Sequence, residues 1–233
     1  MIQAVLFDFN GVVIDDEPLQ MKAFQEVLRD EDIIVTEEEY YGSLGMDDAT
    51  FVRAAFERAG REVDDAKLEE IIGRKTEIHR DLMKDGLPIF PGVVNFIKAL
   101  RHRYPLGLVS MARRSEIDYA LEPAGLHSAF EVIVSADDVQ VCKPDPACYN
   151  RALKLLNETR QSRAHVLPLR PAECLAIEDS PPGVASARAA GMRTLAVTNT
   201  VAERLLREAG AEIVTHSLAD WTTDAVHHVY DKR

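Results

Sequence analysis

Residues 4–11 read AVLFDFNG, a short apolar run that ends in polar and small residues. Continuous apolar runs of this length are typical of strands buried on both faces of a parallel sheet. Asp8 lies inside the run, where an unpaired carboxylate would be costly to bury, so a functional role explains it better than a structural one. Gly11 permits a close approach of the backbone just after the strand.

Five further runs share this form: LGLVSM (106–111), EVIVSADD (131–138), ECLAIEDS (173–180), TLAVTNT (194–200) and AEIVTHS (211–217). Segments with helical spacing separate them, at 93–103, 115–124, 146–156, 183–190 and 202–209. Strands that alternate with helices predict right-handed βαβ units. We therefore expect the α/β class, with a doubly wound, parallel-sheet (Rossmann-like) core.

One part of the chain breaks this alternation. Residues 18–87 contain no strand-like run, but they show amphipathic helical patterns at 19–29, 49–59 and 66–82. The pattern predicts an all-helical cap, residues 17–87, inserted into a core made of residues 1–16 and 88–233. Turn-forming residues at 14–18 and 86–91 mark the two linkers. Residues 157–171 predict a basic surface insertion between a helix and a strand.

Composition narrows the class of protein. The chain has 233 residues, a hydrophobic fraction of 46%, a charged fraction of 28% and a formal charge of -12. Such a charge argues against non-specific binding to nucleic acids or anionic membranes, which need a basic surface. Cys142, Cys148 and Cys174 are too few and too scattered for a disulfide framework or a zinc cluster, so we expect reduced thiols. The apolar segments are too short to span a membrane, and the N-terminus lacks the pattern of a signal peptide. We expect a cytoplasmic protein.

The polar residues at the ends of the predicted strands form a set with one chemistry. In an open parallel sheet, ligands bind beyond the carboxyl ends of the strands. The residues expected there are Asp8, Asn10, Ser110, Lys143, Glu178 and Asp179. Asp8 and Asp179 offer the oxygen ligands that Mg²⁺ prefers. Lys143 supplies a cation that offsets phosphate charge. Ser110 and the backbone N–H of Met111 can donate hydrogen bonds to phosphate oxygens.

Four ordered motifs give this set a family resemblance. FDFNG, the strand-end Ser110, the Lys143-Pro144 pair and IEDSPPGVASARAAG resemble the motifs of the haloacid dehalogenase superfamily. The chain is most similar to the helical-cap branch, which holds small sugar-phosphate phosphatases and phosphohexomutases of the beta-phosphoglucomutase type. The resemblance implies that Asp8 attacks phosphorus and forms an aspartyl-phosphate, which water then hydrolyses. It also implies a Mg²⁺ ion held by Asp8, the Asn10 backbone carbonyl and Asp179, with Glu178 beside them.

Asn10 departs from the family pattern. Family phosphatases and mutases carry an aspartate at this position, which protonates the leaving oxygen and then activates water. An amide can do neither, and loss of general acid–base catalysis lowers a rate by roughly 10²–10⁴-fold. Three explanations stay open: a naturally slow or differently tuned enzyme, a degenerate protein that binds phosphate without turnover, or a deliberate Asp-to-Asn change.

The cap sequence bears on the substrate. Phosphohexomutases carry a histidine near the hinge and a Lys-Gly…Arg pattern for a second phosphate. In this chain, Gln20 occupies the position of that histidine, and Leu44-Gly45 occupies the position of the Lys-Gly pair. Asp48 lies near the position of the arginine, so a second phosphate would meet acidic residues. Mutase activity is therefore disfavoured, and hydrolysis of a small phosphorylated metabolite by a monomer or weak homo-oligomer is expected. The residues expected to bind substrate are Gly11, Gln20, Gly45, Lys75, Ser110 and Met111. A catalytically impaired phosphate-binding protein is the alternative.

Overall fold

A computed structural model describes residues 1–161 and 167–231, and its centre is a six-stranded sheet. Every neighbouring pair of strands is parallel, in the order β3-β2-β1-β4-β5-β6. The strands are β1 (Ala4–Phe7), β2 (Leu106–Val109), β3 (Val132–Val134), β4 (Cys174–Glu178), β5 (Arg193–Val197) and β6 (Ile213–Thr215). All six predicted strands are present, and the doubly wound α/β fold is confirmed.

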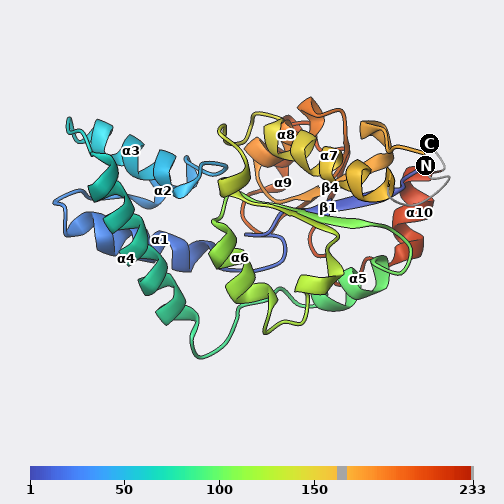
Figure 1. Ribbon diagram of the computed structural model, residues 1–233, viewed down its shortest axis with the longest axis horizontal. Helices are drawn as coiled ribbons and strands as arrows, with labels where there is room; N and C mark the ends of the chain where they lie inside the picture. Colours follow the sequence, from blue (N-terminus) through green and yellow to red (C-terminus); the bar gives the residue numbers. More distant parts are fainter. Residues whose placement is uncertain (162–166, 232–233) are drawn as a thin grey trace.

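Helices cover both faces of this sheet (Figure 1). The helices of one face are α5 (Val93–Leu100), α6 (Arg114–Leu121) and α10 (Thr223–Asp231), and those of the other are α7 (Ala147–Gln161), α8 (Pro181–Ala189) and α9 (Glu203–Glu208). Short 3-10 helices span His127–Ala129, Ala136–Asp138 and Pro171–Glu173. On the first face, the ring of Phe7 meets Phe96 and Phe130 edge-on, which fixes β1 at the centre of the larger core.

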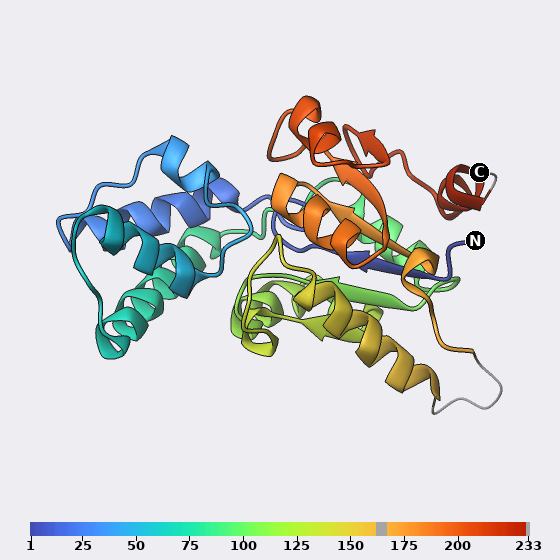
Figure 2. The ribbon, with the colours of Figure 1, turned by 90° about the horizontal axis from the view of Figure 1, so that it is seen from above.

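The remaining helices form a second body, which we call the cap (residues 17–87). They are α1 (Glu17–Arg29), α2 (Glu37–Tyr41), α3 (Asp48–Arg58) and α4 (Asp65–Met83). They enclose an apolar core of their own and lie to one side of the sheet, as Figures 1 and 2 show. Helix α2 escaped the sequence analysis because its five residues are too few to show periodicity. It begins with a reciprocal capping box between Thr36 and Glu39.

Two linkers, near residues 13–15 and 88–90, connect the cap to the core. The backbone N–H of Asp15 donates to the carbonyl of Pro88 at 2.6 Å, and that of Phe90 donates to the carbonyl of Val13 at 3.2 Å. The two linkers therefore run side by side as a narrow hinge just beyond the carboxyl end of β1. This position places the cap over the sheet edge where the predicted site residues gather.

Some local features differ from the prediction. Helix α7 continues to Gln161, although a loop was predicted from Asn157, and residues 162–166 of the expected insertion lie outside the described residues. Helix α10 was not predicted. Gly125, Gly191 and Gly210 follow the ends of three helices, and their φ angles of 64°, 78° and 93° are those of left-handed helix caps. Among the described residues, none of the helices combines the length and the apolar composition that crossing a membrane requires.

A buried ion-pair cluster fastens the cap to the core. Lys75 of α4 is fully buried, and its Nζ lies 3.0 Å from Asp48 of the cap and 3.1 Å from Glu116 of core helix α6. Burial alone would lower the pKa of Lys75, but the two carboxylates outweigh it and hold the pKa above its usual range. The ammonium is therefore charged and bridges the two bodies.

Replacing Lys75 tests this bridge. Lys75→Met leaves two buried carboxylates without their cation, so we expect a loss of about 3–5 kcal/mol in the free energy of unfolding. Lys67→Met on the same helix is the matched control, because Lys67 pairs with Glu31 at 2.7 Å while 34% exposed. Its loss should stay below about 1 kcal/mol. Urea unfolding gives the free energy of unfolding of both variants. Equal losses of stability in the two variants would contradict a bridging role for Lys75.

Candidate active site

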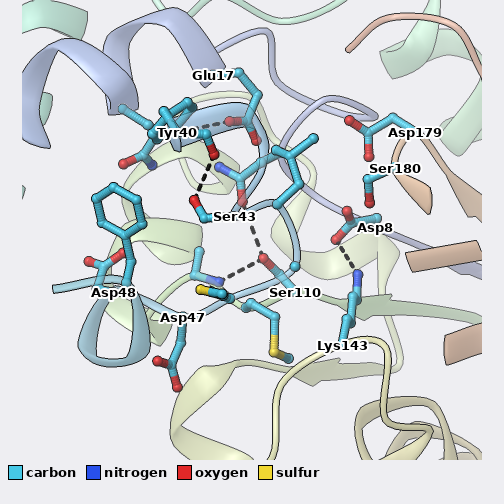
Figure 3. Close-up of a pocket in the computed structure, with 18 of the residues that line it drawn as sticks. Asp8, Glu17, Tyr40, Ser43, Asp47, Asp48, Ser110, Lys143, Asp179 and Ser180 are labelled. Carbon is cyan, nitrogen blue, oxygen red and sulfur yellow. Dashed lines mark hydrogen bonds and ion pairs between the residues drawn. The ribbon is translucent and has the colours of Figure 1, made fainter. Parts of the chain in front are cut away.

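A cavity of about 90 Å³ lies between the carboxyl ends of the strands and the underside of the cap. Its core wall consists of Asp8, Asn10, Ser110, Met111, Ala112, Glu116, Lys143, Asp179 and Ser180. Its cap wall consists of Glu17, Gln20, Phe24, Tyr40, Ser43, Leu44, Gly45, Met46, Asp47, Asp48 and Phe51. Figure 3 shows Asp8, Lys143 and Asp179 at one end, with Glu17, Tyr40 and Asp48 at the other. Five of the six strand-end residues predicted from the sequence therefore line one small pocket, and the sixth, Glu178, contacts Lys143 outside the lining.

Lys143 holds the core end together. Its Nζ lies 2.9 Å from Asp8 Oδ1 and 2.7 Å from Glu178 Oε1, and it also donates to the carbonyl of Val109 at 3.3 Å. The hydroxyl of Tyr149 donates to the same Glu178 oxygen at 2.5 Å. Burial opposes the charged form of Lys143, but Asp8 and Glu178 outweigh it and hold its pKa well above the usual range. A charged lysine thus joins the end of β1 to the end of β4.

Three buried carboxylates converge beside this lysine. Asp8, Glu178 and Asp179 each offer an oxygen within 4.8 Å of the others. Burial, and then the charge of Asp8, raise the pKa of Glu178 to about 7, and the same causes raise that of Asp179 well above its usual value. The hydroxyl of Thr200 donates to Asp179 Oδ2. Glu178 Oε2 has no hydrogen-bond partner among the described residues. One ammonium does not balance three carboxylates, and an oxygen cluster of this kind fits a hard divalent cation such as Mg²⁺.

Two glycines make room for these carboxylates. Gly11 has a φ of 72°, and a Cβ placed on it would lie 1.9 Å from Asp179 Oδ2. A Cβ on Gly183, at the start of α8, would lie 2.0 Å from Glu178 Oε2. Both glycines are therefore required by the carboxylates packed against them, and Gly11 lies beside the acidic cluster, not on the cavity wall.

The Asn10 side chain is fixed by a buried network at the hinge. Its amide nitrogen donates to both oxygens of Asp16 at 3.0 Å, and its amide oxygen accepts from the hydroxyl of Ser110 at 3.3 Å. Asp16 is fully buried, accepts from Gln20 Nε2 at 3.1 Å and lies 3.0 Å from His79 Nε2. Sequence reasoning missed Asp16 and His79. The two consecutive aspartates at the hinge, Asp15 and Asp16, were the sequence feature that could have indicated a role for Asp16.

The residues predicted to bind substrate divide into two groups. Gln20, Gly45, Ser110 and Met111 line the cavity, whereas Lys75 lies outside its lining and is engaged by Asp48 and Glu116. Gly45 lets the cap loop approach the core, because a Cβ there would lie 2.7 Å from the Cβ of Pro182. The predicted cap-loop role of Gly45 thus has a steric basis.

Sequence reasoning also missed three acidic or aromatic residues of the cap end. The Tyr40 hydroxyl donates to Glu17 Oε2 at 2.6 Å, and Glu116 reaches the cavity from the start of α6. Burial, followed by the nearby charge of Asp16, raises the pKa of Glu17 to about 7. These residues come from separate segments, so only the folded chain brings them together.

Comparison with known proteins places this geometry in a family. Residues 2–191 match the haloacid dehalogenase-like hydrolases. Protein SUPPRESSOR OF QUENCHING 1, chloroplastic, of Arabidopsis thaliana is 30% identical over 94% of this chain, which spans 20% of that relative's length. Protein CbbY of Rhodobacter capsulatus is 31% identical over 83% of this chain and 84% of its own length.

Solved structures agree with these sequence matches. CbbY from Rhodobacter sphaeroides in complex with phosphate has a TM-score of 0.77 at 27% identity, over 94% of this chain and 96% of that one. An Asp-to-Asn mutant of the same protein was solved with xylulose-(1,5)bisphosphate. The resemblance drawn from the four sequence motifs is confirmed.

The steric need for Gly11 can be tested by Gly11→Ala. Gly125→Ala is the matched control, because Gly125 has a similar φ of 64° and open space around it. The left-handed backbone should cost each variant about 1–2 kcal/mol of stability. Gly11→Ala should lose about 1–3 kcal/mol more, because it displaces the Asp179 carboxylate. It should also lose stabilisation by added Mg²⁺, which the control keeps. Urea unfolding with and without Mg²⁺ measures both effects, and indistinguishable variants would refute the steric argument.

The burial of Glu17 predicts a pH-dependent stability. The pKa of Glu17 is raised from 4.5 to about 7, so the folded chain holds a proton there that the unfolded chain releases. The resulting stabilisation is present below about pH 4.5 and is lost as the pH rises through 7. Between pH 5 and 8, Glu17→Gln should therefore gain about 2–3 kcal/mol relative to the unchanged chain.

Metal-free urea unfolding at several pH values measures this gain. Glu57→Gln, on the exposed surface of α3, makes the same carboxylate-to-amide change and should follow the unchanged chain. If the curve for Glu17→Gln also runs parallel to that of the unchanged chain, the Glu17 carboxyl is not buried as described.

Proposed function

Because this chain belongs to the haloacid dehalogenase-like hydrolase family, we propose that it hydrolyses a small phosphomonoester through an aspartyl-phosphate on Asp8. One observation carries the proposal. Asp8 lines a small pocket 2.9 Å from the buried Lys143 ammonium, and two further buried carboxyl groups lie close enough to share a cation with it. Nucleophile, cation and metal ligands are the parts that phosphoryl transfer requires.

Each residue has a definite task in this reaction. An oxygen of Asp8 attacks phosphorus, the bond between phosphorus and the leaving oxygen breaks, and that oxygen takes up a proton. Water then attacks the aspartyl-phosphate, which releases phosphate and restores Asp8. Lys143 orients the Asp8 carboxylate and offsets phosphate charge, while Ser110 and the N–H of Met111 donate to phosphate oxygens. Asp8, Asp179 and the Asn10 carbonyl would hold Mg²⁺ beside Glu178, and the bound ion would neutralise charge on the phosphate.

We expect this hydrolysis to be slow because residue 10 is an asparagine. A carboxyl group at position 10 would give a proton to the leaving oxygen and take one from the attacking water. The amide of Asn10 can do neither at neutral pH. The carboxylate of Asp16 does not replace it directly, because it lies behind the Asn10 amide and is fully buried. Proton transfer must then go through water, so the proposal predicts an attenuated enzyme with otherwise intact machinery.

A second candidate is a phosphate-binding protein without turnover. The observation that favours it is the Asn10 network itself, which fixes the amide between Asp16 and Ser110. A site arranged to hold an amide at this position would bind a phosphoester without releasing it. The two candidates differ in whether Mg²⁺-dependent phosphate release occurs at all.

The decisive experiment measures phosphate release from an aryl phosphate and a small panel of sugar phosphates. The unchanged chain should release phosphate slowly and only with Mg²⁺, and Asp8→Asn should abolish this release. Asn10→Asp alone sets a second carboxylate against Asp16, so it should recover only part of the activity. The exchange variant Asn10→Asp/Asp16→Asn keeps one amide and one carboxylate in contact, and its rate should rise about 10²–10⁴-fold.

The outcomes separate the candidates. Release by the unchanged chain that survives in Asp8→Asn would contradict the nucleophile. Silence of the unchanged chain, with rescue in the exchange variant, would favour the binding protein built on an intact catalytic frame. Silence of every variant, despite binding of phosphate, would overturn the hydrolase proposal.

A further inference from the structure

The cap end of the cavity presents hydrogen-bond acceptors. Glu17, Asp48 and Glu116 contribute carboxylates to its wall, and Gln20 contributes an amide. Among the described residues that line the cavity, the only basic side chain is Lys143, which lies at the opposite end and pairs with Asp8 and Glu178. The two ends of the pocket therefore differ in chemistry.

Two of the acceptor atoms at the cap end are buried without a partner. Gln20 Oε1 and Glu116 Oε2 have no hydrogen bond among the described residues, although the two residues are only 6% and 4% exposed. An unsatisfied buried acceptor is costly, and structures normally supply it with a donor. Because both residues line the cavity, a bound molecule can supply the missing donors.

The charge at this end is also incompletely balanced. Lys75 compensates part of it, but its ammonium already contacts Asp48 at 3.0 Å and Glu116 at 3.1 Å from outside the cavity lining. Glu17 accepts a hydrogen bond from the Tyr40 hydroxyl and forms no salt bridge within the described residues. Two carboxylates therefore share one ammonium. The third group, Glu17, has a raised pKa because it is buried without a positive partner, and a bound cation would favour its charged form.

Aromatic rings complete the wall. Phe24, Tyr40 and Phe51 line the cap end beside the carboxylates. The ring of Phe24 already carries Lys75 Nζ at 4.8 Å from its centre, which shows that a cation suits this environment. Rings next to carboxylates attract ammonium groups and offer nothing to a phosphate.

We propose that the substrate of this site is a phosphomonoester whose leaving group carries an ammonium group, bound at the cap end by Glu17, Gln20 and Glu116. The inference rests on the proposed function for the position of the phosphate beside Asp8 and Lys143. An ammonium supplies three donors and one positive charge. Its three donors match the unpartnered acceptors of this wall, and its charge offsets that of the carboxylates. A hydroxyl group would supply one donor and leave the charge unbalanced.

A matched pair of esters tests the inference on the full chain with Mg²⁺. Aminoethyl phosphate and hydroxyethyl phosphate differ only in the terminal group, and the corresponding propyl esters extend the comparison in length. Calorimetry gives the dissociation constant of each ester, and phosphate release gives its kcat/KM. The amino ester should bind about ten- to a hundredfold more tightly than its hydroxyl partner, as expected for a charge-assisted hydrogen bond.

Variants of the cap end locate the preference. Glu17→Gln and Glu116→Gln should each reduce the ratio of the two dissociation constants toward one. Glu57→Gln, on the exposed face of α3, should leave the ratio unchanged. If Glu116→Gln loosens the contact with Lys75, its unfolding midpoint will show this, and Glu17→Gln then decides alone.

The results distinguish this inference from the function on which it rests. Absence of phosphate release from all four esters, with preferred binding of the amino esters, would support the inference and count against hydrolysis. Phosphate release with equal affinity for both kinds of ester would support hydrolysis and overturn the ammonium site. The ammonium site would also be overturned if the hydroxyl esters bound more tightly than the amino esters, or if none of the four esters bound.

Discussion

The buried ammonium of Lys143 is the contact on which the site depends. Carboxylates at the ends of β1 and β4 could not approach one another in a low-dielectric interior without a cation between them. Lys143 lies 2.9 Å from Asp8 and 2.7 Å from Glu178, and so allows two neighbouring strands to end in acidic residues. With Asp179 added, one ammonium faces three buried carboxyl groups. The fold thus creates a site suited to a divalent cation in the same place where it positions the Asp8 carboxylate.

A similar constraint connects residues 10 and 16. The Asn10 amide donates to both oxygens of Asp16, and Asp16 is also held by Gln20 and lies close to His79. A carboxylate at position 10 would face that of Asp16 across the same short distance, and the two would repel. The surroundings of Asn10 are therefore suited to an amide.

The sequence predicted the sheet well because each strand is a continuous apolar run, and it predicted the core end of the site because Asp8, Ser110 and Asp179 follow such runs directly. Other features have no comparable local signal. Helix α2 is too short for periodicity, and the burial of Lys75 depends on carboxylates that precede it by 27 residues and follow it by 41. Its charge suggested a residue that binds substrate, whereas its neighbours make it part of the cap–core contact.

Each end of the cavity has more carboxyl groups than positively charged side chains. Each end therefore favours a cation, and the cap contributes to specificity. At the core end, excess carboxylates call for a metal ion, which in turn attracts phosphate. At the cap end, Glu17, Asp48 and Glu116 exceed the single charge of Lys75, and Gln20 adds a buried acceptor. A molecule with two phosphates would satisfy one end and be repelled by the other. A molecule with a phosphate at one terminus and a cation at the other satisfies both, so electrostatic balance alone selects its orientation.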